Sequence, residues 1–213
     1  MAAYAGMPHR NRVTPLGEIV AVPERGTLMG NRGVLHDEDG TIRREWHVRR
    51  WIACRLEFRG RHRELLQPRR WTELFFLDEA TALAAGHRPC AECRNADFRR
   101  WQRCWAAAHP DAAISAGAID RALHADRLTP DRAKRTFSAP RGELPTGAMV
   151  LLDGAPWLVT GAALRLWTPG GYTRSRTVGA RAALTVLTPA AAVAAISASY
   201  EPELHPTAVS PVA

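Results

Sequence analysis

The sequence predicts an α+β protein, in which a mixed region of strands and helices is followed by further helices and a small β-rich unit. Residues 50–58 alternate between apolar and polar side chains, as in a strand with one buried face. Phe98, Trp101 and Trp105 recur at the spacing of a core-facing helix stripe. Further along, Asp153-Gly154 lies between two apolar runs and is typical of a β-hairpin turn.

The composition is that of an ordinary globular protein. Hydrophobic residues make up 46% of the 213 residues and charged residues 23%. No stretch approaches the roughly 18 apolar residues that a membrane span needs. Residues 1–14 lack the apolar run of a secretory signal. We therefore expect a cytoplasmic protein with no membrane segment.

Three regions of different character follow one another along the chain. They are an N-terminal leader with a glycine-rich loop, an arginine-rich α+β region, and a small β-rich unit with a terminal helix, at residues 1–40, 41–143 and 144–213. The first region holds one strand candidate, residues 18–22, and its glycine-rich part is expected to be a loop.

The middle region contains several further elements. Residues 74–77 form a second, wholly apolar strand candidate. Asp78 is placed to cap the short helix that follows, and Gly86 to end it. A longer helix then extends to about Ala108. Two more helices are predicted at residues 118–128 and 130–137, the second with Thr129 as its cap.

The last region is predicted to contain short strands and one helix. The strand candidates are residues 149–152, 157–159, 164–167 and 184–187. Residues 169–172 are expected to form a turn, and Thr188-Pro189 begins an alanine-rich helix. Few charged residues occur in this region, which fits a partner surface or a small cleft.

Positive charge is concentrated in one segment. The formal net charge is +8, and Lys134 is the one lysine of the sequence. Residues 41–71 hold ten arginines against three glutamates, nearly the whole excess. Such a strip is expected of a phosphate-binding surface, and a solvated arginine-rich face is the alternative. The candidate nucleic-acid contacts are Arg49, Arg50, Arg55, Arg59, Arg61, Arg63, Arg69 and Arg70.

The cysteines indicate a metal site. In a chain without an export signal, the Cys90-x-x-Cys93 pair is better explained by a metal than by a disulfide. Zinc takes four ligands in a tetrahedron, and thiolates two residues apart can bind one ion from a tight turn. Cys93 is expected in the first turn of a helix, where the helix dipole favours a thiolate. Cys104 is expected to pack beside the aromatic stripe.

The segment around this pair resembles the second half of the Ada-type zinc-binding module. Residues 75–94 contain a Phe-Phe strand, a short helix ending in Ala-Gly, and then Arg-Pro-Cys-x-x-Cys. The resemblance implies a zinc ion bound by four cysteines and contact with DNA, with one thiolate accepting a methyl group from a backbone phosphate. Here His87 replaces the aromatic residue of the module, and the upstream Cys-x-x-x-Cys pair is missing. We therefore expect a structural zinc rather than a methyl acceptor.

Cys54 is the expected third ligand, because it is the one cysteine upstream of this segment. His62 lies near the position of the module's second upstream ligand, with His36 and His47 as alternatives. A Cys₃His site is ordinary for zinc. The other interpretations are a buried strand cysteine for Cys54 and a solvent-facing side chain for His62.

Three functions fit the sequence. The first is a zinc-stabilised nucleic-acid-binding protein that prefers DNA over RNA and could take part in DNA repair. Its exposed aromatic residues would stack on bases, and the candidates are Trp46, Trp51 and Trp71; the alternative is that these tryptophans belong to the core. The second is a nuclease or base hydrolase with a structural zinc. Its candidate acid–base groups are Glu73, Asp78, Glu79, His36, His124 and Asp126. The third is a protein-interaction module that exposes Trp157, Trp167 and Tyr172.

Overall fold

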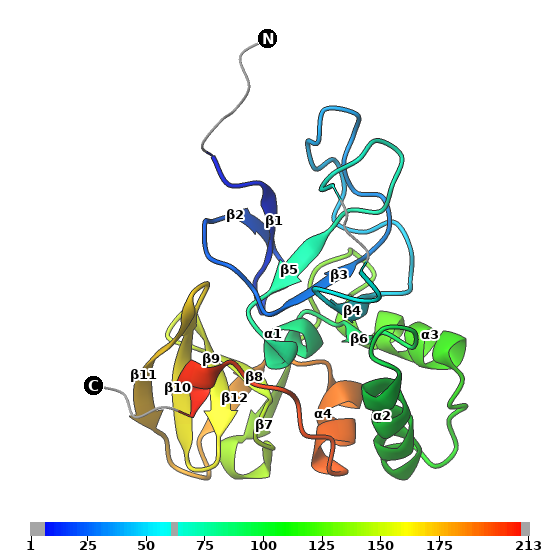
Figure 1. The fold of residues 1–213 in the computed structure, drawn as a ribbon. Coiled ribbons are helices and arrows are strands. Elements are labelled where there is room, and N and C mark those ends of the chain that lie inside the picture. The colour runs from blue at the N-terminus through cyan, green and yellow to red at the C-terminus, as the bar shows by residue number, and fades with distance from the viewer. Residues whose placement is uncertain (1–6, 61–63, 210–213) are drawn as a thin grey trace.

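The computed structural model describes residues 7–60 and 64–209 and confirms the α+β class. Two six-stranded sheets are joined through a buried helix, and three further helices gather beside them (Figure 1). Within the described residues, no helix is long and apolar enough to cross a membrane. The four α-helices are α1 (Glu79–Ala84), α2 (Asn95–Ala108), α3 (Ala116–Arg127) and α4 (Ala190–Ser197).

The first sheet is formed by the N-terminal part of the chain in the order β2-β1-β5-β3-β4-β6. Its strands are β1 (Arg10–Val13), β2 (Ile19–Ala21), β3 (Leu28–Asn31), β4 (Ile52–Arg55), β5 (Leu74–Phe76) and β6 (Arg88–Pro89). The β1–β5 and β4–β6 pairs are parallel, and the others are antiparallel. The strands predicted at residues 18–22, 50–58 and 74–77 are present, the second only in its central part.

The two faces of this sheet differ. Leu28, Ala53 and Phe76 belong to a core that includes residues of α1. Met29 pairs with both Cys54 and Phe75 and shares the opposite face with them, since paired residues of neighbouring strands point to the same side. No helix of the described part covers that opposite face, which holds the cysteines and the cleft described below.

The second sheet is wholly antiparallel, in the order β11-β10-β9-β8-β12-β7. Its strands are β7 (Phe137–Pro140), β8 (Met149–Leu152), β9 (Ala155–Thr160), β10 (Ala163–Thr168), β11 (Gly171–Thr177) and β12 (Ala183–Val186). All four strands predicted after residue 144 are found, and so is the hairpin at Asp153-Gly154. The described residues also form two short 3₁₀ helices, η1 (Arg141–Glu143) and η2 (Pro206–Ala208).

The helix predicted at residues 130–137 is wrong. A turn occupies this segment: Leu128 bridges Lys134, Thr129 N donates to Ala133 O at 2.9 Å, and Arg132 has a positive φ of 71°. Thr129 and Pro130 fit the first two positions of a turn as well as they fit a helix start, so the local signal was ambiguous.

Helix α1 connects the two sheets. All six of its residues are buried. Ala82 packs toward the first sheet, whereas Ala80 and Ala84 contact Met149 and Leu158 of the second. Small side chains let a helix pack closely on both sides, which explains the three alanines among its six residues.

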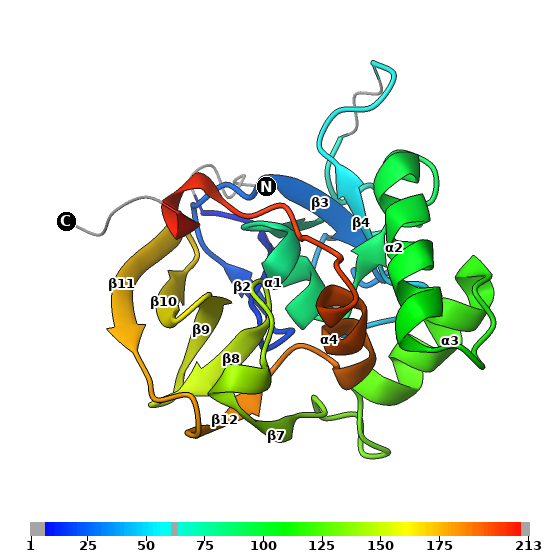
Figure 2. The same ribbon diagram turned by 90° about the horizontal axis from the view of Figure 1, so that it is seen from below.

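Helices α2, α3 and α4 form a separate cluster around the aromatic stripe predicted from the sequence (Figure 2). Trp101 and Trp105 of α2 are fully buried against Ile196 of α4. Cys104 belongs to the same cluster, which confirms its packing role. The terminal helix thus packs on the middle region of the chain as well as following the second sheet.

Candidate metal centre

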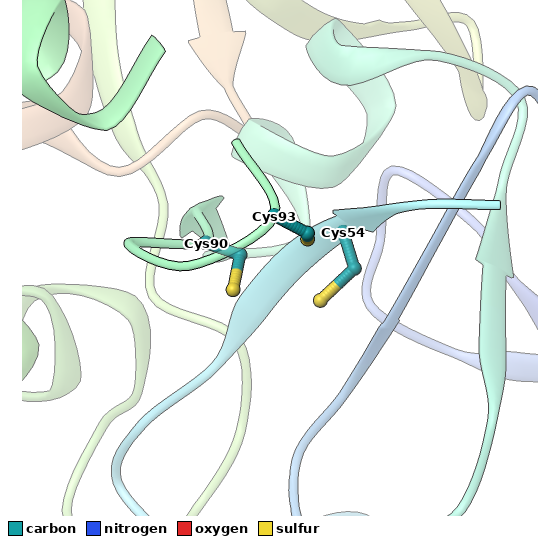
Figure 3. A group of neighbouring side chains, drawn as sticks. All are labelled: Cys54, Cys90 and Cys93. Carbon is teal, nitrogen blue, oxygen red and sulfur yellow. The ribbon is translucent and has the colours of Figure 1, made fainter. Parts of the chain in front are cut away.

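Three cysteines meet on the open face of the first sheet. Their sulfur atoms all lie within 4.8 Å of one another. Figure 3 shows Cys54 on β4, with Cys90 and Cys93 on the turn beside it. Among the residues that the structure describes, this is the one group of His, Cys, Asp or Glu side chains close enough to hold a metal ion.

The backbone around Cys90 explains how the sequence builds this turn. Parallel pairing of β6 with β4 places Cys90 N against Ala53 O at 2.9 Å, directly beside Cys54. Arg94 N then donates to Cys90 O at 3.2 Å and closes a turn over residues 90–94. Glu92 N points at the Cys90 sulfur, 3.4 Å away, and backbone N–H groups directed at a sulfur stabilise a thiolate.

Cys93 lies just before α2 rather than in its first turn. The helix begins at Asn95 with Arg94 as its N-cap, so the prediction for Cys93 was off by two residues. The turn takes up these two residues because Cys93 must fold back toward Cys90. A thiolate there is still close to the positive end of the helix dipole.

The three thiols contact one another and shift one another's pKa. Hydrogen bonds from Cys54 and Cys93 lower the pKa of the Cys90 thiol to about 2. The same contacts, together with burial, raise the pKa of Cys54 far above its ordinary value. Three sulfurs in such contact, two of them buried, favour at least one negative charge, and a divalent cation would replace the shared protons and hold all three as thiolates.

This donor set fits zinc. Two thiolates on a tetrahedral zinc lie about 3.8 Å apart, given Zn–S bonds of roughly 2.3 Å. The observed sulfur separations are all within 4.8 Å, so at most a contraction of about 1 Å would reach that value. Cys54 and Cys90 are each 8% exposed, so the metal would be largely shielded from solvent.

The structure leaves the fourth ligand to be identified. His62 lies outside the described residues. The ring nitrogens of His36 contact Thr72 Oγ1 at 2.6 Å and Gln67 O at 3.1 Å, so both nitrogens of His36 are occupied. His47 is not part of the cysteine group. His87 is buried, and its ring packs against those of Phe76 and Trp51.

An open cleft of about 800 Å³ lies over the cysteines. Cys54, Cys90 and Cys93 all line it. Apolar and aromatic side chains supply much of the remaining lining, namely Met29, Val48, Ile52, Leu56, Phe58, Leu65, Trp71 and Phe75. The candidate metal is therefore next to a cleft of the size that small-ligand sites commonly have.

The candidate nucleic-acid contacts that the structure describes are exposed, as expected of a solvent-facing strip. They are Arg49, Arg50, Arg55, Arg59, Arg69 and Arg70, whereas Arg61 and Arg63 lie outside the described residues. Arg50, Arg55 and Arg59 line the cleft. Arg69 pairs with Glu38 at 3.3 Å on the surface.

The predicted acid–base groups are mostly structural. Asp78 caps α1 by accepting from Thr81 N at 2.8 Å, and its other oxygen accepts from Tyr172 Oη at 2.8 Å and His205 N at 3.1 Å. Glu79 accepts from Tyr200 Oη at 2.6 Å and pairs with Arg94 at 2.9 Å. Both carboxylates attach the C-terminal segment to α1.

His124 and Asp126 are also accounted for by packing. His124 Nδ1 contacts Arg127 at 2.8 Å. Asp126 accepts a hydrogen bond from Ala191 N at 2.7 Å, at the first turn of α4, and so caps a helix distant in sequence. Of the predicted acid–base candidates, Glu73 alone lines the cleft.

A buried cationic cluster around Trp51 could not be predicted from the sequence. The guanidinium carbons of Arg32 and Arg127 lie 4.2 Å and 3.7 Å from the centre of the Trp51 ring. Trp51 is thus a core residue, whereas Trp71 lines the cleft and Trp46 packs on His124. Arginines this far apart in sequence carry no local signal of burial.

The aromatic residues of the second sheet do not form a surface. Trp157 and Tyr172 are buried, and Trp167 Nε1 donates to Thr81 Oγ1 at 3.1 Å. The interaction-module hypothesis therefore loses the exposed rings on which it relied.

Comparisons with models of protein families, with curated proteins and with solved structures find no match to this chain.

Proposed function

We propose that this protein is a zinc-stabilised nucleic-acid-binding protein, with DNA as the favoured partner. The supporting observation is that three clustered thiols and the side chains of Arg50, Arg55 and Arg59 line the same cleft. Zinc would fix the turn at Cys90 and Cys93 against β4, and the arginines would contact backbone phosphates.

The resemblance of residues 75–94 to the Ada-type module favours DNA over RNA and suggests a role in repair. Cys54 would supply one of the two ligands that the module's upstream pair provides, because β4 lies beside the turn that holds Cys90. With two of its three thiols buried, the site suits a structural ion better than a thiolate that must meet a substrate.

The test is the salt dependence of binding to labelled DNA. We expect the affinity of the full-length chain to fall steeply with rising salt. Changing Arg50 and Arg55 to glutamine should reduce affinity about tenfold or more and lower the slope of log K against log salt by about 2. The matched control changes Arg174 and Arg181, exposed arginines outside the cleft lining, and should alter neither quantity.

The absence of binding to duplex DNA, single-stranded DNA and RNA alike would refute the proposal. Binding that is indifferent to salt, or that the control pair weakens as much as the cleft pair does, would also contradict it.

A further inference from the structure

We infer that the cleft receives an unpaired nucleobase, so that the protein binds single-stranded nucleic acid in preference to a duplex. This inference rests on the proposed function and specifies its substrate. A purely phosphate-binding surface needs only exposed cations, whereas this cleft combines cations with an apolar floor and a buried carboxylate.

The floor of the cleft is the open face of the first sheet. Met29, Ile52 and Phe75 lie there on adjacent strands, and the half-buried Trp71 adds an indole. Bases stacked inside a duplex present only their edges and cannot reach such a floor. An unstacked base can lie against it, and base–aromatic stacking contributes roughly 1–3 kcal/mol per base.

Arginines at the rim of the cleft would contact the sugar-phosphate backbone. Arg50, Arg55 and Arg59 belong to the lining and are exposed. The guanidinium of Arg59 also lies 4.9 Å from the centre of the Phe58 ring, an arginine–aromatic pair of the kind that takes part in stacking with bases.

Glu73 supplies a polar group that phosphate binding does not explain. It is 3% exposed and lines the cleft. Across the described residues, its carboxylate accepts one hydrogen bond, from Leu66 N to Oε2 at 3.0 Å. Its Oε1 is not among the fully buried side-chain atoms that lack a partner, so this oxygen is open to the cleft and can accept a further hydrogen bond.

A base edge with N–H donors would complete the hydrogen bonding of Glu73. Cytosine, adenine and guanine each have an exocyclic amino group, and a carboxylate can accept a hydrogen bond from it. Thymine lacks an amino group, and its one donor, N3–H, lies between two carbonyl oxygens that would repel the carboxylate. The cleft should therefore favour amino-bearing bases over thymine.

Glu73 is a poor candidate for chemistry at the metal. It directly precedes β5, and β3 separates β5 from β4, where Cys54 lies. The carboxylate and the thiols are thus at different parts of one cleft. This spacing suits a ligand that extends across the sheet.

The experiment measures binding of the zinc-loaded chain to labelled oligonucleotides of equal length: oligo-dC, oligo-dT and a mixed duplex. We expect oligo-dC to bind about tenfold more tightly than the duplex and severalfold more tightly than oligo-dT. Glu73→Gln should abolish the preference of dC over dT, because the amide can also donate to thymine carbonyls. It should leave the salt slope unchanged.

A second variant addresses the stacking floor independently. Trp71→Leu should weaken single-strand binding about tenfold and leave duplex binding unaffected. Trp46→Leu is the matched control, since Trp46 is half-buried and does not line the cleft. Melting temperature and zinc content establish that each variant is folded.

The outcomes separate the two proposals. Equal affinity for single strands and duplex, with binding still salt-dependent, would overturn this inference and leave the proposed function standing. A dC preference that survives Glu73→Gln would remove Glu73 from base recognition and contradict the inference in that respect. If no nucleic acid binds, both proposals fail.

Discussion

At the scale of single residues, the molecule buries an unusual amount of positive charge. Arg32 and Arg127 are almost fully buried, and the guanidinium groups of both lie over the Trp51 ring. Burial lowers the pKa of both guanidinium groups, and each is near the other. Their hydrogen bonds go to carbonyl oxygens, such as Gly17 O and Gly86 O, and to ring nitrogens of His87 and His124, rather than to carboxylates. The cluster therefore carries a net cost of desolvation that the surrounding fold must offset.

The amine of Lys134 belongs to the same environment. It donates to Ala84 O at 2.6 Å, at the C-terminal end of α1. Burial, and secondarily the charge of Arg32, lower the pKa of Lys134 to about 7. In the unfolded chain this amine keeps an ordinary pKa near 10.4. Between these values the unfolded state binds more protons than the folded state, so stability rises with pH.

We predict that the free energy of unfolding of the wild type, relative to Lys134→Met, increases by about 2 kcal/mol between pH 7 and pH 9. The comparison with the variant cancels contributions from the cysteines and other titrating groups. Denaturant titrations of both proteins at several pH values measure this difference. Parallel pH profiles would show that the Lys134 amine titrates normally and is not desolvated.

The cysteines show how far residue-level reasoning extends. Cys90 and Cys93 could be identified from their spacing and surroundings. Cys54 could be proposed as a partner, but a strand position alone did not separate a ligand from a core cysteine. Cys54 lies beside Cys90 because β4 pairs in parallel with β6. Strand β6 has only two residues, too few to be predicted from a sequence pattern.

At the scale of elements, two helices end in the same way with different residues. After α1, Gly86 has a φ of 87°, with Gly86 N bonded to Leu83 O and His87 N to Ala82 O. After α4, Ser199 has a φ of 74°, with equivalent bonds to Ile196 O and from Tyr200 N to Ala195 O. Both are Schellman endings, in which the left-handed residue is usually glycine.

Ser199→Gly should therefore stabilise the protein by about 1 kcal/mol, because glycine adopts this conformation without the strain that a Cβ imposes. Gly86→Ala is the matched opposite change. It should destabilise by more than that amount, since a Cβ there would also lie 2.6 Å from Arg127 Cδ. Thermal unfolding of both variants measures the effects. A lower melting temperature for Ser199→Gly would contradict this account of the α4 ending.

The elements that could not be predicted share a physical cause. The N-terminal segment was expected to be a loose leader, yet β1 forms because Asn11 and Val13 are buried while Arg10 and Arg12 donate to backbone carbonyls. The seven-residue β11 has five consecutive exposed residues, so it lacks apolar alternation. Both strands are stabilised by pairing with neighbouring strands, and the pattern of their own side chains does not predict them.

At the scale of the whole molecule, the C-terminal segment holds the parts together. Tyr200 and the backbone of Glu203 bind Glu79, and the backbone of His205 binds Asp78. Helix α1 leads into β6 and Cys90, so the C-terminal segment stabilises the base of the candidate metal site. The division of the chain at residue 144 stays a prediction. Strand β7 precedes residue 144 and yet pairs with the second sheet, and helix α4 follows residue 144 and yet packs on α2.

The central claim is that Cys54, Cys90 and Cys93 hold one zinc ion, and elemental analysis of the purified chain tests it most directly. We predict about one zinc per chain in the wild type, lost in Cys54→Ser and in Cys90→Ser. Cys104→Ser, which changes a buried cysteine of the helical cluster, should retain it. A wild type free of metal after expression in zinc-supplemented medium, or a Cys90→Ser protein with its zinc intact, would contradict the claim.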